Sequence, residues 1–184
     1  GVKNVINVAH RMGITTLNAD HYGLSLTLGG GEVTLLDMVF AYTVFANNGT
    51  MMGEPVPPEK RLPGYRELQP VAILRVEDKN GRVLKQFTGP ESRPILSPQL
   101  AYLITHILSD NKARIAAFGP NNMLQLSRPA AVKTGTTNDW RDAWTIGYTP
   151  QICVGVWVGN TNNEPMERVP GSRGAAPIWH NIME

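Results

Sequence analysis

The stretch AVKTGTTNDWRDAWTIGYTPQICVGVWVG (131–159) decides the fold, because it holds short segments rich in β-branched and aromatic residues between turn-forming ones. The three segments cover 130–136, 143–148 and 152–158. Connections this short favour antiparallel neighbours. In the third segment neither face is polar, since valines alternate with cysteine, glycine and tryptophan. The sequence therefore predicts an antiparallel sheet over 129–159 that is covered on both faces.

Two helices are predicted in the first part of the chain. Apolar residues recur at helical spacing over 5–12, and Gly13 ends that run. Thr34 and Asp37 have the spacing of a capping box, although aspartate is a less usual partner there than glutamate. A run of apolar residues follows and ends at Asn47-Asn48-Gly49, so we expect a second helix that is buried on most of its circumference.

Two more helices are predicted further along the chain. Ser97 is a candidate N-cap with Pro98 at the first helical position. The expected apolar face of that helix consists of Leu100, Leu103, Ile104, Ile107 and Leu108. A final helix over 177–183 is expected to pack on the sheet through Ile178, Trp179 and Ile182.

The middle of the chain indicates a long connection and a hairpin. Residues 50–68 hold several prolines and mixed charges, and are expected to be irregular. Asn80-Gly81 tolerates the positive φ angles of a tight turn and lies between two strand-like segments, 71–77 and 82–87. The pattern predicts a peripheral hairpin over 70–88. Together these elements predict a mixed α/β fold of the α+β type, an antiparallel sheet covered by helices.

The composition excludes several classes of function. The formal net charge is only +2 and charged residues make up 17% of 184, which argues against a nucleic-acid partner or membrane contact by this segment. Cys153 is the only cysteine, and the four histidines lie far apart, so neither a disulfide nor a metal site is expected. No cofactor is indicated. The chain begins with Gly1 rather than methionine, so we expect a piece of a longer protein.

Lys133-Thr134-Gly135 at the end of a strand is the most informative motif. A lysine there places a cation where it can hold an anionic substrate, and a threonine hydroxyl can bind a carboxylate. Glycine has no side chain, so an extended peptide can lie against the strand edge. The alternative is an ordinary strand end with a solvated lysine.

The wider sequence resembles the class A penicillin-binding proteins, the serine transpeptidases that cross-link peptidoglycan. The resemblance runs in order over nearly the whole chain. It is carried by LGGGEVTLLDMVFAYTVFANNG (28–49), AAFG (116–119), VKTGTTNDWRDAWTIGYTP (132–150), VGVWVGN (154–160) and APIWHNIM (176–183). It implies the serine β-lactamase/transpeptidase-like fold, of which this chain is the C-terminal part.

The resemblance also implies roles for the residues of the motif. An active-site serine in an S-x-x-K motif would attack a D-Ala-D-Ala stem peptide, and β-lactams would stall at the acyl-enzyme. Lys133 would be the cation near that serine, and Thr134 and Thr136 would bind the carboxylate of the peptide or antibiotic. Gly135 would line the same edge. The N–H of Thr136 would supply half of the oxyanion hole.

This chain departs from the family pattern in its serine motifs. Ser109-Asp110-Asn111-Lys112 fits both S-x-x-K and S-x-N, but with one serine, and it lies at a helix end where aspartate and asparagine cap helices. We therefore expect the nucleophile on the upstream half of the same domain, since 1–14 resembles the helix that follows S-x-N. This chain alone is expected to be inactive.

The resemblance places the parent protein on the outer face of the bacterial cytoplasmic membrane, with an N-terminal anchor and a glycosyltransferase domain. Two alternatives remain open. One is a D,D-carboxypeptidase or β-lactamase of the same fold, which would release the acyl group to water. The other is a non-catalytic module that senses or binds penicillin or the cell wall. Covalent labelling by a β-lactam separates the second from the enzymes.

Overall fold

The computed structural model describes all 184 residues and confirms the predicted sheet. Its strands are β6 (Ala131–Thr136), β7 (Asp142–Tyr148) and β8 (Cys153–Gly159). They are antiparallel in the order β6-β7-β8, with Lys133 opposite Ile146 and Trp144 opposite Trp157. Both β6 and β8 are edge strands, so the sheet has two open edges.

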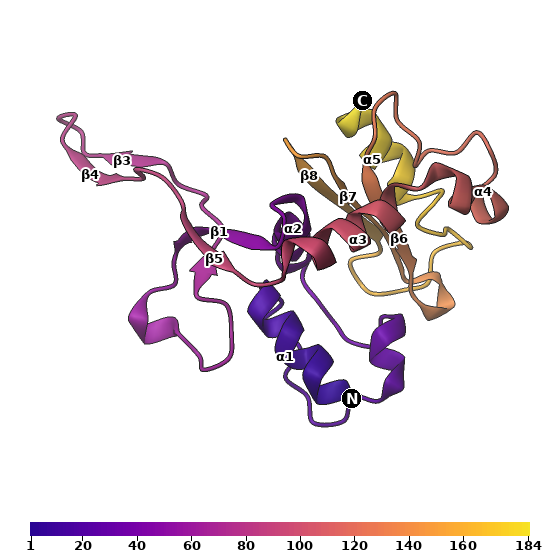
Figure 1. The fold of residues 1–184 in the computed structure, drawn as a ribbon, viewed down its shortest axis with the longest axis horizontal. Coiled ribbons are helices and arrows are strands. Elements are labelled where there is room, and N and C mark those ends of the chain that lie inside the picture. The colour runs from indigo at the N-terminus through magenta and orange to yellow at the C-terminus, as the bar shows by residue number, and fades with distance from the viewer.

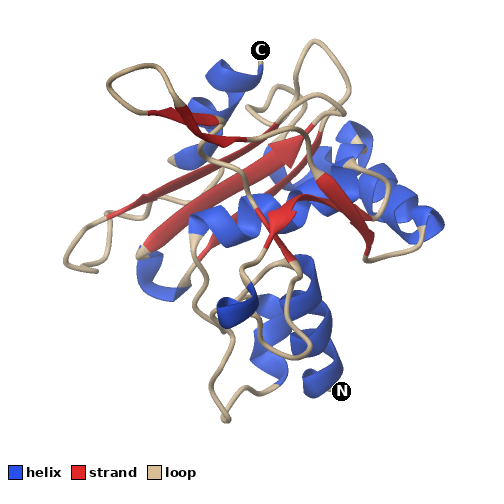
Figure 2. Ribbon diagram, turned by 90° about the vertical axis from the view of Figure 1, so that its left-hand side faces the viewer, coloured by secondary structure: helices blue, strands red, loops and turns tan.

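Helices cover both faces of this sheet, as Figures 1 and 2 show. On one face lie α2 (Leu35–Ala46) and α3 (Pro98–Ser109), and on the other lies α5 (Ala175–Met183). Glycines in the strands let the helices approach closely. A Cβ at Gly155 would lie 2.4 Å from Val39 Cγ2 of α2, and one at Gly147 would lie 2.5 Å from Trp179 Cζ2 of α5.

The main hydrophobic core lies between the sheet and α5. Trp179 is fully buried there, with valines of β6 and β8 around it. The helix packs through Ala175, Ala176, Trp179 and Met183. The predicted packing of Trp179 is confirmed, but Ile178 and Ile182 are exposed at 47% and 56%, so that part of the prediction is wrong. The small residues face the sheet because they allow the closest approach.

The predicted apolar face of α3 is confirmed only in part, since Ile104 and Leu108 are half-buried. Leu100, Leu103 and Ile107 are all exposed, at 45%, 56% and 66%. The helix instead buries the small Ala101 and joins the sheet by the Thr105 and Tyr148 hydroxyls, whose oxygens lie 2.8 Å apart. Within this chain the main packing partners of α3 are α2 and β6. Its apolar stripe therefore lies uncovered.

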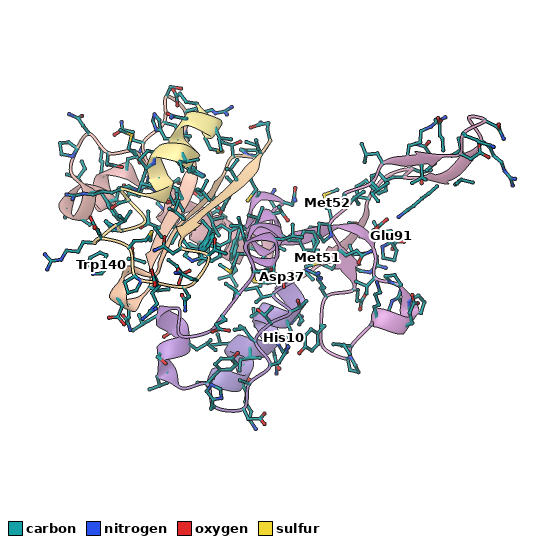
Figure 3. The ribbon with its side chains drawn as sticks, turned by 180° about the vertical axis from the view of Figure 1, so that it is seen from behind. His10, Asp37, Met51, Met52, Glu91 and Trp140 are labelled. Atoms are coloured by element: carbon teal, nitrogen blue, oxygen red, sulfur yellow. The ribbon has the colours of Figure 1, made fainter.

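A second core joins α1 (Val2–Met12) to α2 and to the strand β1 (Thr50–Pro55), whose Met51 is labelled in Figure 3. Gly13 ends α1 at a φ of 115°, as predicted. Thr34 caps α2 by accepting from the N–H of Asp37. The capping box is only half formed, however, because the carboxylate of buried Asp37 accepts from the N–H and hydroxyl of Thr15 and from Arg66 instead.

Residues 50–68 are not all irregular, which corrects the sequence-based expectation. β1 (Thr50–Pro55) pairs antiparallel with β2 (Leu68–Gln69) and with β5 (Glu91–Pro94). The predicted hairpin is confirmed as β3 (Arg75–Glu77) and β4 (Val83–Gln86), and it projects far from the rest of the molecule (Figure 1).

The remaining elements are short. The helix α4 (Asn111–Phe118), which the sequence did not indicate, follows α3 directly. Turns of 3₁₀ helix cover Leu24–Leu28, Pro58–Lys60 and Asn138–Trp140. None of the helices has both the length and the apolar character needed to cross a bilayer.

Candidate functional site

The open edge of β6 brings the motif residues together, with Lys133, Thr134, Gly135 and Thr136 following one another along it. The N–H of Thr137 donates to the C=O of Asp142 over 3.1 Å, which makes these two residues a hydrogen-bonded pair. Such pairs alternate along an antiparallel ladder. The register therefore turns the N–H and C=O of Thr134 and Thr136 away from β7, toward the open edge.

The side chain of Lys133 lies on the face of the sheet that α2 and α3 cover. Lys133 is directly opposite Ile146, whose Cγ1 lies beside Gly155 on the α2 side. The lysine is exposed, and its Nζ donates to the C=O of Thr134 over 2.5 Å. This bond holds the cation against the open edge.

Thr134 and Thr136 share the opposite face, on the side of α5. Thr134 is half-buried, whereas Thr136 is exposed. The hydroxyl oxygen of Thr136 accepts from the N–H of Gly171, over 3.0 Å. Its own proton has no partner among the 184 residues and is free to donate to a ligand. The edge thus offers a cation, hydroxyls and outward N–H groups, a set suited to an extended ligand with a carboxylate.

Asp142 fixes the turn that follows β6. Its carboxylate accepts from the Thr137 hydroxyl over 3.0 Å and from the Trp157 indole N–H over 2.8 Å. Neither Asp139 nor Asp142 forms an ion pair, and the guanidinium of Arg141 donates to the C=O of Asn163 instead.

Ser109 is part of a helix junction. Its hydroxyl donates to the C=O of His106 over 3.2 Å. The carboxylate of Asp110 accepts from the N–H of Ala113, which caps α4 and lowers the pKa of Asp110. The predicted capping is therefore confirmed for Asp110, whereas the Asn111 side chain accepts from Arg114 and caps no helix.

The other reactive side chain, Cys153, is not suited to nucleophilic chemistry. Its thiol lies against α2, with Sγ 3.6 Å from the C=O of Val39, and burial raises the pKa of Cys153 to about 12. The thiolate is the reactive form of cysteine, so this thiol is inert at neutral pH. Side chains of His, Cys, Asp and Glu nowhere gather in a group that could hold a metal ion.

Gly171 is the residue of this site that sequence reasoning missed. It lies 35 positions from Thr136, and only the fold brings its N–H to that hydroxyl. No short motif indicates it, because glycines are frequent throughout this chain.

Comparison with known sequences finds relatives of this chain, although no protein-family model matches it. It is 34% identical over 189 residues to penicillin-binding protein 1A of Aquifex aeolicus, covering 100% of this chain and 22% of that protein. It is 35% identical over 181 residues to penicillin-binding protein 1A of Clostridium acetobutylicum, covering 96% of this chain and 19% of that protein. The chain thus spans about a fifth of the length of these curated relatives.

Solved structures have the same fold. Penicillin-binding protein A of M. tuberculosis, as its imipenem acyl-enzyme complex, superposes with a TM-score of 0.70 at 20% identity, covering 100% of this chain and 42% of that one. Penicillin-binding protein 1A of Haemophilus influenzae superposes with a TM-score of 0.65 at 20% identity, covering 98% of this chain and 32% of that one. Sequence identity over the whole chain and a shared fold thus agree, and the chain belongs to the penicillin-binding protein family.

Proposed function

We propose that this chain is the C-terminal part of the transpeptidase domain of a serine D-Ala-D-Ala transpeptidase that cross-links peptidoglycan stem peptides and is acylated by β-lactams. The observation that carries the proposal is the open edge of β6, where Lys133 and the outward main-chain groups of Thr134 and Thr136 lie together. The names of the relatives support it, as do neighbours of the same fold that hold imipenem and penicillin G as acyl-enzymes.

In the proposed reaction, a serine outside this chain attacks the penultimate D-alanine carbonyl. The serine oxygen forms an ester bond, the peptide C–N bond breaks, and terminal D-alanine leaves with a proton on its nitrogen. An amine of a neighbouring stem peptide then takes the acyl group and frees the serine. A β-lactam follows the first step only, because its ring nitrogen stays tethered to the acyl group.

The residues of β6 have separate roles in this scheme. Lys133 stabilises the negative charge of the ligand carboxylate and assists proton transfer at the serine. The hydroxyls of Thr134 and Thr136 bind that carboxylate, and Gly135 leaves room for the peptide to lie along the edge. The N–H of Thr136 donates to the developing oxyanion.

The upstream half of the domain is the proposed partner of this chain. Two uncovered features support this. One is the exposed apolar stripe of α3, formed by Leu100, Leu103 and Ile107. The other is the outer edge of β8, a strand of seven residues that pairs with β7 alone. Burying such a stripe and pairing such an edge stabilise a fold. We place the longer protein on the outer face of the cytoplasmic membrane, with its anchor and a glycosyltransferase domain outside this segment.

The test is a transfer assay with the full-length protein. A stem peptide ending in D-Ala-D-Ala is incubated with and without glycine as the acceptor amine, and D-alanine and the glycine adduct are measured. We expect D-alanine release together with the glycine adduct. Release of D-alanine with hydrolysis alone would contradict a transpeptidase and favour the carboxypeptidase. No release and no covalent penicillin label would favour the non-catalytic module.

A further inference from the structure

One residue of the loop before α5 reaches the open edge of β6. The N–H of Gly171 donates to Thr136 Oγ1 over 3.0 Å. Its C=O accepts from the N–H groups of Ala175 and Ala176, over 3.1 and 2.9 Å, and from the hydroxyl of fully buried Thr145 over 3.2 Å. The Gly171 peptide therefore joins β6, β7 and the first turn of α5.

No side chain fits at position 171. A Cβ would lie 2.4 Å from the carbonyl oxygen of Gly135 and 2.4 Å from that of Trp144, far inside van der Waals contact. Gly135 and Trp144 face each other in the β6–β7 ladder, so their carbonyls cannot move without disturbing it. Glycine is required because two strands and the loop meet backbone to backbone.

We infer that Gly171 is a positioning residue for the hydroxyl of Thr136, an inference that rests on the proposed function. A threonine hydroxyl has one proton and two acceptor positions. The N–H of Gly171 occupies one acceptor position, which holds the side chain in one rotamer and leaves the proton to donate to a carboxylate at the edge. The hydrogen bond that the Thr136 oxygen accepts from Gly171 also makes the Thr136 O–H a stronger donor. Gly171 thus orients the hydroxyl that binds the carboxylate, without touching the ligand itself.

The test compares two ligands that differ only in the carboxylate, penicillin G and its methyl ester, on the full-length protein. Gly171→Ala should lower the second-order rate of acylation by penicillin G by about tenfold to a hundredfold, as expected for a weakened hydrogen bond to a charged group. The rate with the methyl ester should fall by less than about threefold, because the ester has no anion to recognise. A general packing defect would lower both rates equally.

Gly174→Ala is the matched control. Gly174 lies in the same loop, and its Cβ would meet Val169 Cγ1 at 2.7 Å and Ala143 Cβ at 3.3 Å, without contact with Thr136. It should change the two rates by the same factor. Thr136→Val, which keeps the shape but has no hydroxyl, should reproduce the selective loss, and Gly171→Ala should add little to it. Thr136→Ser should restore recognition.

Each remaining outcome decides against the inference. If Gly171→Ala lowers both acylation rates equally, or if its loss adds in full to that of Thr136→Val in the double variant, Gly171 acts on packing alone. If Gly171→Ala does not fold, unchanged selectivity in Thr136→Val overturns the inference by itself. If penicillin G does not acylate the wild-type protein, the proposed function fails first and this inference fails with it.

Discussion

Replacing Lys133 with alanine in the full-length protein is expected to lower the second-order rate of acylation by penicillin G by roughly 10²- to 10⁴-fold. The ammonium group is the only cation of the motif, and its bond to the C=O of Thr134 holds it at the open edge of β6. Its loss removes both the charge that attracts the carboxylate and the group that assists proton transfer at the serine. Stopped-flow measurement with a fluorescent penicillin gives the rate.

Two further lysine variants make this prediction specific. Lys133→Arg keeps the charge but cannot give up a proton, so we expect it to retain ligand binding while acylation stays slow. Lys112→Ala removes an exposed lysine of the Ser109-Asp110-Asn111-Lys112 stretch and should leave the rate unchanged. Because Lys133 is exposed, its substitution should change the free energy of unfolding by less than about 1 kcal/mol. An unchanged acylation rate in Lys133→Ala would contradict the chemical role proposed for Lys133 on β6.

Replacing Asp37 with alanine is expected to lower the free energy of unfolding by about 3–5 kcal/mol, the usual cost of leaving a buried charge without its partner. Asp37 is 5% exposed and accepts from the N–H and hydroxyl of Thr15, at 2.8 and 2.6 Å, and from Arg66 at 2.9 Å. Arg66 also donates to the C=O of Gly13 and lies over the ring of Phe40. These bonds join α1, α2 and the connection before β2.

Calorimetry of the full-length protein measures this effect, as a fall of roughly 10 °C in the Tm of the transition that contains this segment. The matched control is Glu67→Ala, which removes an exposed partner of Arg93 and should cost less than about 1 kcal/mol. Double substitution of Asp37 and Arg66 by leucine and methionine should recover part of the loss, because no unpaired charge remains. A similar Tm shift for Asp37→Ala and Glu67→Ala would contradict the account.

The parts of the fold with local signals could be predicted from the sequence. The three strands of the main sheet follow from their β-branched residues and short turns, and Asn80-Gly81 between two strand-like segments indicated the β3–β4 hairpin. The strands β1, β2 and β5 have no such signal. They have two to six residues, β1 and β5 each include a proline, and all three form because distant segments pair.

Helical periodicity predicted where α3 and α5 run but not which face each buries. The periodicity marks an apolar stripe, and it gives no information on whether the partner surface lies in the same 184 residues. For α3 the stripe of Leu100, Leu103 and Ile107 remains exposed here. In α5 the alanines lie against the sheet because small residues permit close packing, which a ranking by hydrophobicity does not capture.

The candidate site divides in the same way. Lys133 to Thr136 are contiguous, so their chemistry and spacing could be recognised from the sequence. Gly171 could not, because its contribution is a main-chain N–H placed by packing between β6, β7 and α5. A glycine whose role is close approach of backbones leaves no chemical signature of its own.

The most direct test of the central claim is to locate the penicillin adduct. The full-length protein is acylated with penicillin G and digested, and the peptide that carries the added mass is identified by mass spectrometry. The account predicts one adduct, on a serine three residues before a lysine and outside these 184 residues. An adduct on Ser109, or on any other serine of this chain, would contradict it, and so would the absence of any adduct.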